Sequence, residues 1–159
     1  MQNPAEIKVR PATLEDAEFL VRGNAQLALE TENLSLDVAR LRQGVQALLE
    51  NPERGFYLIG EINNTRAGQM LITYEWSDWR NGVFWWIQSV YSVPEFRRRG
   101  VFRAIYAQAE ALARQQGNVC GLRLYVEAHN QGAHATYRRC GMRETAYRML
   151  EVDHVIDRR

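Results

Sequence analysis

Two hydrophobic periodicities alternate along the chain and predict its elements. Alternating or nearly continuous apolar residues are typical of strands, whereas apolar residues three and four positions apart are typical of helices. The strand patterns cover residues 6–12, 55–62, 67–76, 83–93, 121–128 and 142–153. The helix patterns cover residues 13–30, 35–51, 101–116 and 130–140. The predicted order is therefore β-αα-βββ-α-β-α-β, that of an α/β (α+β) domain with a mixed sheet.

Cap and turn residues set the boundaries of these elements. Thr13, with Asp16 three residues later, is a short version of the capping box at the start of the first helix. The second helix begins after either Ser35 or Asp37, since both residue types are good N-caps. The segment 63–66, Asn-Asn-Thr-Arg, predicts a hairpin turn between two neighbouring strands.

Size and composition bound the number of domains. The 159 residues suffice for one domain with a substantial core and are too few for two of ordinary size. Apolar residues make up 46% and charged residues 25%, which is ordinary for a globular protein and argues against disorder. We therefore expect a single domain over residues 1–159.

Charge and targeting signals bear on partners and location. A net charge of +1 provides no global field that would hold the protein on nucleic acid or on a membrane. The N-terminal residues lack the basic and then apolar run of a signal peptide, and the longest uncharged stretch, 81–94, is too short to cross a bilayer. These features predict a soluble, cytoplasmic protein with neither nucleic acid nor a membrane as its partner.

The sequence predicts no metal site. Cys120 and Cys140 are interpreted as small residues at the edge of a core, as in a reduced protein, with a disulfide between them as the alternative. His129 and His134 have no ligand-forming partner at a suitable spacing and are interpreted as surface or cap residues.

Residues 95–102, Glu-Phe-Arg-Arg-Arg-Gly-Val-Phe, concentrate positive charge directly before a helix. A helix N-terminus has unpaired N–H groups and a partial positive charge, and Gly100 would let the backbone lie close to a ligand. With Arg103, these arginines are typical of a cradle for phosphates, although a solvated basic turn would explain the same residues. A dinucleotide fold is disfavoured because no G-x-G-x-x-G follows the first strand.

A second motif follows about thirty residues later. Asn130, Ala133, Tyr137 and Gly141 stand at the spacing N-x-x-A-x-x-x-Y-x-x-x-G. Helical periodicity puts Ala133 and Tyr137 on one face, with Asn130 at the cap. Ordinary core packing is the alternative explanation of the Ala-Tyr pair.

In this order, the two motifs resemble those of the GCN5-related N-acetyltransferases, the GNAT family. The family motif [Q/R]-x-x-G-x-[G/A] corresponds to Arg97–Phe102, and the second motif, which ends in G-[F/M], is matched by Asn130–Met142. The resemblance extends from about Lys8 to Val152 and implies a GNAT-like mixed, largely antiparallel sheet flanked by helices. One position departs from the motif: Phe102 replaces a small residue, so its ring should turn into the helix's buried face.

The resemblance implies acetyl-CoA as co-substrate and no metal. Backbone N–H groups of the turn would hold the pyrophosphate, at Arg98, Arg99, Gly100, Val101, Phe102 and Arg103. The end of the preceding strand would pair with the pantetheine arm and polarise the thioester carbonyl, at Val90, Tyr91 and Ser92. Asn130 would contact the cofactor, and Tyr137 would lie near its sulfur.

Tyr137 is accordingly the candidate general acid. A phenol titrates near 10 and a thiol near about 8.5, so Tyr137 can stay protonated and still donate a proton to the departing thiolate. The candidates for a base or for amine recognition are Glu30, Glu32 and Glu75, with Asp78 nearby. Glu30 and Glu32 can face one groove only if the first helix has ended by then.

The strand 83–93 adds polar and aromatic candidates. Gln88 and Ser89 interrupt its apolar run. Buried polar groups need partners, so at least one of these two side chains should face the active-site cleft that the family resemblance implies. The four tryptophans lie near the same cleft and are expected mostly in the core, although an aromatic wall would suit a cationic amine.

The main hypothesis is an N-acetyltransferase that transfers an acetyl group from acetyl-CoA to a primary amine of a small molecule or peptide. A non-catalytic acyl-CoA-binding or sensing module of the same fold is the alternative. Nucleic-acid binding through the arginines is disfavoured because no second basic patch is present. The acceptor and the oligomeric state stay open, with a homodimer among the expectations because dimers are common in the family.

Overall fold

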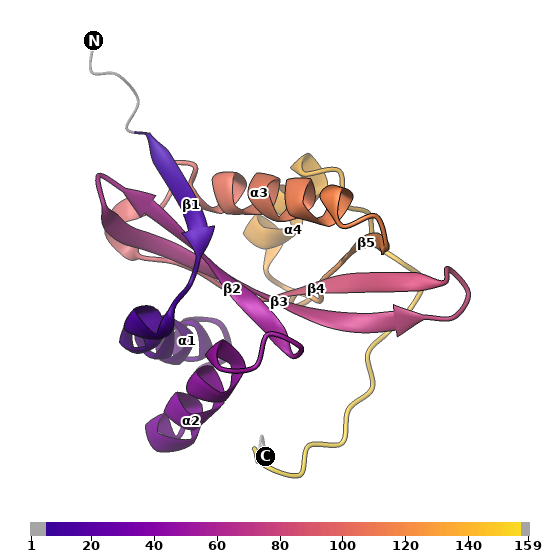
Figure 1. The fold of residues 1–159 in the computed structure, drawn as a ribbon. Helices are drawn as coiled ribbons and strands as arrows, with labels where there is room; N and C mark the ends of the chain where they lie inside the picture. The colour runs from indigo at the N-terminus through magenta and orange to yellow at the C-terminus, as the bar shows by residue number, and fades with distance from the viewer. Residues whose placement is uncertain (1–5, 157–159) are drawn as a thin grey trace. The chain divides into compact units, whose positions relative to one another are not determined.

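A computed structural model describes residues 6–156 (Figure 1). The chain divides into two compact units, residues 1–127 and 128–159. The first holds a five-stranded sheet and three α-helices, and the second holds the last helix and the segment after it. The predicted order β-αα-βββ-α-β-α is confirmed.

The sheet has the order β1-β2-β3-β4-β5. Strands β1 to β4 pair antiparallel, whereas β5 runs parallel to β4, so the expected mixed and largely antiparallel sheet is confirmed. The strands are β1 (Ile7–Pro11), β2 (Gly55–Ile62), β3 (Thr65–Ser77), β4 (Gly82–Ser92) and β5 (Val119–Arg123).

The turn between β2 and β3 is tighter than the sequence suggests. It consists of Asn63 and Asn64 alone, with φ values of 50° and 60°. Two left-handed residues in succession match the twist of the flanking strands, and asparagine tolerates this region better than most residues. The expected four-residue turn therefore shortens to two, and β3 begins at Thr65.

Side-chain caps begin the first two helices. The Thr13 N–H donates to the Asp16 carboxylate at 2.8 Å, which confirms the capping box. A short 3₁₀ turn (Leu14–Asp16) precedes α1 (Ala17–Glu32), and α2 (Val38–Leu49) follows. Asp37, and not Ser35, caps α2, because its carboxylate accepts from the N–H groups of Ala39 and Arg40.

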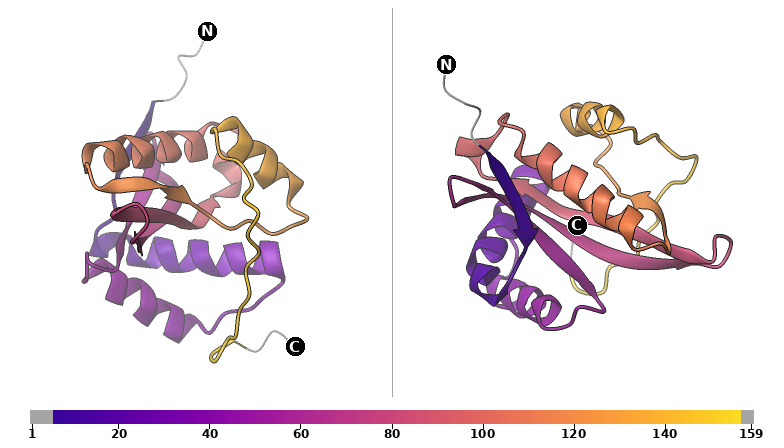
Figure 2. Two further views of the ribbon diagram at one scale, coloured as in Figure 1. Left: turned by 90° about the vertical axis from the view of Figure 1, so that its right-hand side faces the viewer. Right: turned by 45° about the horizontal axis from the view of Figure 1, so that its top comes forward.

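Helices cover both faces of the sheet. In Figure 2, α1 and α2 lie together on one face, and α3 (Val101–Gln115) crosses the other. The first face buries a cluster of apolar side chains from the two helices, β2 and β3: Leu20, Val21, Val45, Tyr57, Ile59 and Leu71. This cluster fixes α1 against the strands that carry the candidate site.

Two paired glycines let α3 approach the sheet closely. Gly60 and Gly68 face each other across β2 and β3. A Cβ at Gly60 would come within 3.0 Å of Ile105 and Val101, and one at Gly68 within 2.7 Å of Val101. Any larger residue would push the first turns of α3 outward, so these glycines help to position the N-terminus of that helix.

A buried ion network ties β1, β2 and β3 to the start of α1. Asp16 is 0% exposed and accepts from Arg10 at 2.7 Å and from Arg66 at 2.6 Å. Arg10 also bridges to Glu61 at 2.8 Å. Burial alone would raise the pKa of Asp16, but hydrogen bonds from Arg10, the Thr13 N–H and Arg66 outweigh it and hold the pKa far below its usual value.

The second unit begins with α4 (Gln131–Arg139). The Asn130 side chain caps it by accepting from the Ala133 N–H at 3.1 Å, and Gly141 lies just past its end with a φ of 85°. Both expected helix boundaries are thus confirmed. Arg138 pairs with Glu144, which ties the helix to the segment that follows it.

Two strand predictions were wrong in this part of the chain. Strand β5 covers Val119–Arg123 and not 121–128, because its pairing with β4 ends at Trp86 and Arg123. The segment 142–153 alternates as a strand does, but it has no strand assignment and takes part in no pairing among the described residues. Alternation alone does not make a strand, since the backbone also needs a hydrogen-bonded neighbour.

Cys120 and Cys140 form no disulfide in the described part of the chain, which excludes that alternative.

Candidate functional site

Strand β4 has one open edge where it leaves β5. The two strands pair only from Val83 to Trp86 on β4, and β4 continues to Ser92. Beyond Trp86, no strand among the described residues pairs with β4 on that side. Such an edge presents backbone N–H and C=O groups that an extended, amide-bearing molecule can pair with. Val90, Tyr91 and Ser92 all lie on it.

A β-bulge interrupts the pairing of β4 with β3, in the part of β4 that has the open edge. The register with β3 passes from Gln69 opposite Tyr91 to Leu71 opposite Gln88, so two residues of β4 stand against one of β3. Ser89, inside the bulge, has a φ of 49°. Bulges turn backbone groups out of the regular ladder and are frequent next to active sites.

The arginine turn connects this edge to α3. Arg98 and Gly100 both have left-handed backbones, with φ values of 62° and 88°. Gly100 is the N-cap of α3, and the first helical bond runs from the Ala104 N–H to the Gly100 carbonyl at 3.0 Å. The N–H groups of Val101, Phe102 and Arg103 therefore lie outside the helical ladder, at the end where the helix dipole favours an anion.

The four arginines of the turn differ in their surroundings. Arg97 bridges to Glu30 at 2.7 Å and donates from Nε to the Ser92 carbonyl at 3.0 Å. Arg98, Arg99 and Arg103 are exposed and form no salt bridge within the described residues. Arg97 thus ties the turn to α1 and β4, whereas the other three leave their charge available to solvent or to a ligand.

The candidate carboxylates on α1 do not face one groove. The helix continues to Glu32, so Glu30 and Glu32 are two helical positions apart and point in different directions. The expectation that the helix ends earlier was wrong: Asn33, with a φ of 51°, is the residue that terminates it. The Glu30 carboxylate is engaged by Arg97, and the Tyr91 phenol lies 3.4 Å from it.

The third candidate, Glu75, is held by two donors. Its carboxylate accepts from Arg123 at 2.6 Å and from the Trp86 indole N–H at 2.6 Å. The Tyr125 ring lies 6.0 Å from that of Trp86. Because both oxygens of this carboxylate already accept a hydrogen bond, the arrangement favours recognition of an acceptor over proton abstraction. Asp78 lies in the following turn and accepts from the Trp79 N–H.

The polar residues of β4 have protein partners. Gln88 donates to the Thr73 hydroxyl at 2.5 Å, and Ser89 forms the bulge. The tryptophans divide evenly, which corrects the expectation that most are core residues: Trp85 is buried and Trp86 half-buried, whereas Trp76 and Trp79 are 61% and 85% exposed. Trp76 lies near the end of β3, and Trp79 lies in the turn between β3 and β4, which Figure 1 shows at the end of the sheet away from α1 and α2.

Phe102 packs as the sequence requires. The side chain is half-buried, and its ring centroid lies 5.9 Å from that of Tyr106, one turn further along α3. The large side chain at this motif position therefore packs along α3.

Tyr137 and Asn130 belong to the second unit. Tyr137 lies on α4, one helical turn after Ala133, and is half-buried. Burial, with a smaller effect from Cys140, raises the pKa of its phenol. The phenol is therefore protonated at neutral pH, as a general acid requires. The Asn130 side chain is engaged as the helix cap.

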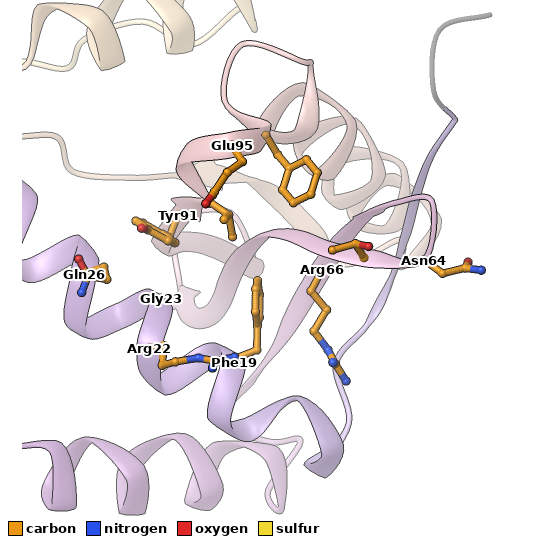
Figure 3. A pocket seen from close by; sticks show the side chains of 11 residues that line it. Phe19, Arg22, Gly23, Gln26, Asn64, Arg66, Tyr91 and Glu95 are labelled. Carbon is orange, nitrogen blue, oxygen red and sulfur yellow. The ribbon is translucent and has the colours of Figure 1, made fainter.

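A cavity of about 720 Å³ opens on the α1 side of the sheet (Figure 3). It lies among α1, the β2–β3 turn, the end of β4 and the 3₁₀ turn (Pro94–Phe96). Tyr91 is the only predicted cofactor residue that lines it, and none of the candidate carboxylates does. Arg22, Arg66 and Glu95 give its wall charges of both signs.

Several residues around the site escaped the sequence-based prediction. Arg123 engages Glu75, and its guanidinium stacks 3.6 Å from the centroid of Phe84. A charged residue inside an apolar strand was the available signal. Gln69 and Asn24 lie behind the bulge, and Gln69 could have been noticed as a polar residue in the apolar strand 67–76.

Comparison with known proteins decides the family. The model of the Acetyltransferase (GNAT) family matches residues 25–142, which include both motifs. The chain belongs to the GNAT family of acetyltransferases.

Solved structures described as acetyltransferases share the fold of this chain. A protein described as a possible acetyltransferase from Clostridium difficile 630 is 40% identical, with a TM-score of 0.87, over 94% of this chain and 99% of that one. A predicted acetyltransferase from Clostridium acetobutylicum, solved with acetyl-CoA, is 19% identical with a TM-score of 0.75, over 93% of this chain and 96% of that one. The aminoglycoside N-acetyltransferase AAC(6')-Iy, in complex with CoA, is 13% identical with a TM-score of 0.75, over 98% and 99%.

No curated protein matches the sequence. Within residues 6–156, no helix has the length and apolar character needed to cross a bilayer. The same residues contain no cluster of three or more His, Cys, Asp or Glu side chains suited to a metal ion.

Proposed function

We propose that this GNAT protein is an N-acetyltransferase that transfers an acetyl group from acetyl-CoA to a primary amine of a small molecule or peptide. The observation that carries the proposal is the open, bulged edge of β4 running directly into the left-handed turn at the N-terminus of α3. An extended arm can pair with the edge, and a pyrophosphate can bind the turn. Two neighbouring subsites of these kinds suit CoA.

In this proposal, the backbone of the turn binds the pyrophosphate. Gly100 supplies the left-handed cap, and Val101, Phe102 and Arg103 contribute N–H groups of the first helical turn. The exposed side chains of Arg98, Arg99 and Arg103 add positive charge. The pantetheine arm pairs with the edge of β4 at Val90, Tyr91 and Ser92, and Asn130 contacts the cofactor from α4.

The reaction is direct attack in a ternary complex. The neutral amine forms a bond to the thioester carbon, the carbon–sulfur bond breaks, and the electron pair passes to sulfur. The Tyr137 phenol donates its proton to the departing thiolate. The amine loses a proton to water or to a carboxylate, for which Glu30 and Glu32 are the candidates, while Glu75 with Trp86 and Tyr125 forms an acceptor surface.

Calorimetric titration tests the first step of this proposal. Acetyl-CoA and CoA should bind with micromolar affinity, and 3'-dephospho-CoA should bind more tightly than ATP, because only the former offers both pyrophosphate and pantetheine. Absence of binding to acetyl-CoA and CoA would overturn the proposal. A screen of amines for thiol release then identifies acceptors; binding without turnover of any amine would point to the non-catalytic acyl-CoA-binding module.

A further inference from the structure

A buried network of side chains lies directly behind the bulge of β4. Gln69 on β3 is 0% exposed, and its Nε2 donates to the Ser89 carbonyl at 3.3 Å and to Asn24 Oδ1 at 3.2 Å. Asn24 on α1 in turn donates to the Tyr57 phenol on β2 at 3.0 Å. Three separate elements are thereby connected to the one left-handed residue of β4.

The network is poorly explained by stability alone. Gln69 Oε1 is buried and has no hydrogen-bond partner within the described residues. A buried acceptor without a partner is destabilising, and an apolar side chain of the same shape would avoid that cost. The left-handed backbone of Ser89 is also unfavourable for a residue other than glycine and persists only where its surroundings hold it. Two unfavourable features at one point suggest a functional role.

The geometry of a peptide bond connects this network to the open edge. The Ser89 carbonyl and the Val90 N–H belong to one trans peptide, in which the two groups point in opposite directions. The Gln69 amide holds the carbonyl toward the interior between α1 and the sheet. Fixing the carbonyl therefore also fixes the direction of the Val90 N–H, away from the Gln69 amide.

We propose that Gln69, supported by Asn24, is a positioning residue that aims the Val90 N–H at the carbonyl oxygen of the bound acetyl thioester. This inference rests on the proposed acetyl-CoA-dependent function. A donor fixed before the reaction stabilises the negative charge that develops on that oxygen, and such a donor loses its effect when it is misplaced by about an ångström. Gln69 itself touches neither the cofactor nor the amine.

The most direct variant is Gln69→Met, which keeps the length of the side chain and removes both of its donors. Gly23→Ala perturbs the same amide group without changing Gln69 itself. Gly23 lies on α1 (Figure 3), and a Cβ there would be 2.2 Å from Gln69 Oε1 and would displace it. Gly44→Ala is the matched control: it is the same substitution inside α2, where nothing lies within 4 Å of the added methyl. Folding of each variant is checked by its thermal midpoint.

The primary measurement is the infrared stretch of [1-¹³C]acetyl-CoA bound to each protein, since a hydrogen bond to the carbonyl oxygen lowers its frequency. Wild type and Gly44→Ala should show the lowered frequency, and Gln69→Met and Gly23→Ala should return it toward that of free acetyl-CoA. The dissociation constant for CoA should change by less than about twofold. With an amine acceptor, kcat should fall roughly 10- to 100-fold in the same two variants.

The ¹⁵N-labelled protein without ligand gives an independent readout. The Val90 amide resonance and its hydrogen exchange should change in Gln69→Met and Gly23→Ala but not in Gly44→Ala. In the double variant Ser89→Gly, Gln69→Met, the carbonyl frequency should be lower than in Gln69→Met alone and closer to that of the wild type. Glycine adopts a positive φ without strain, so the bulge should need less support from Gln69.

The outcomes separate this inference from the proposed function. Failure of the wild type to bind acetyl-CoA would overturn the function itself. Normal binding with an unchanged carbonyl frequency and an unchanged Val90 amide in Gln69→Met and Gly23→Ala would overturn the positioning role alone. Parallel losses of thermal stability and CoA affinity would identify Gln69 as merely structural, which also overturns it.

Discussion

At the scale of single residues, Tyr137 is the proposed general acid that protonates the departing thiolate of CoA. Its phenol is half-buried, and burial raises its pKa, so it stays protonated throughout the neutral range, as the proposed role of general acid requires. Tyr137→Phe removes the transferable proton and preserves the ring. We expect kcat to fall by about 10²–10⁴ while the dissociation constant of acetyl-CoA stays within about twofold, measured by steady-state kinetics and calorimetry.

The control for this prediction is Tyr147→Phe, which removes a phenol that is 79% exposed and should leave kcat unchanged. Unaltered turnover in Tyr137→Phe would eliminate Tyr137 as the acid.

A glycine is needed at position 100 because of its left-handed backbone, and not because a side chain would lack room there. Its φ is 88°, whereas the nearest atom to an added Cβ would be Ile7 Cδ1 at an ordinary 3.6 Å. A β-branched residue rarely adopts a left-handed backbone. Gly100→Val should therefore change the conformation of the turn and displace its N–H groups. We expect acetyl-CoA to bind roughly tenfold more weakly, which corresponds to about 1.4 kcal/mol.

Gly100→Asn provides the matched comparison, because asparagine tolerates a left-handed backbone. Calorimetry should find its affinity close to that of the wild type. Equal affinity of both variants would mean that the conformation of the turn does not matter for binding.

At the scale of elements, α2 shows the contribution of a single cap. The Asp37 carboxylate accepts from the N–H groups of Ala39 and Arg40 at 2.9 Å and 3.1 Å. Asp37→Ala leaves both donors to water and should lower the free energy of unfolding by about 1 kcal/mol, measured by urea denaturation. Asp37→Asn should retain most of that stability; a loss as large as that of the alanine variant would show that charge, and not the cap, is responsible.

At the scale of the whole molecule, the Asp16 network makes stability depend on pH. Hydrogen bonds from Arg10, the Thr13 N–H and Arg66 outweigh the effect of burial and hold the folded-state pKa of Asp16 well below its unfolded value of about 3.9. The unfolded state therefore takes up the proton first. The contribution of Asp16 is complete above roughly pH 5 and is lost as pH falls through and below about 4.

Asp16→Asn tests this linkage. It should lower the free energy of unfolding at pH 7 by about 2–3 kcal/mol, because the buried site loses charged hydrogen bonds. Thermal midpoints from pH 7 to pH 3 should fall less steeply below pH 5 in the variant than in the wild type. Identical slopes would assign the acid sensitivity of the protein to other carboxylates.

Much of the fold was predictable because local patterns set it. The helix boundaries at Asn130 and Gly141 follow from cap chemistry within a few residues of chain, and the apolar runs located four of the five strands closely. The segment 142–153 was mispredicted because alternation of apolar and polar residues reports only the two faces of a strand. It does not show whether another strand is available to pair with. The early end of β5 has the same origin in pairing.

The sequence by itself predicted the resemblance to the GNAT family, the order of elements as far as α4 and the two motifs, since these depend on residue type and spacing. Only the tertiary structure decided that Glu30 pairs with Arg97, that Glu75 is held by Arg123 and Trp86, and that Gln69 lies behind the bulge at Ser89. The contacts of Glu75 and Gln69 depend on the pairing of β3, β4 and β5, and that of Glu30 depends on where α1 packs on the sheet, so their distances and angles are set by the tertiary structure. A linear pattern of residue types contains no information on such angles.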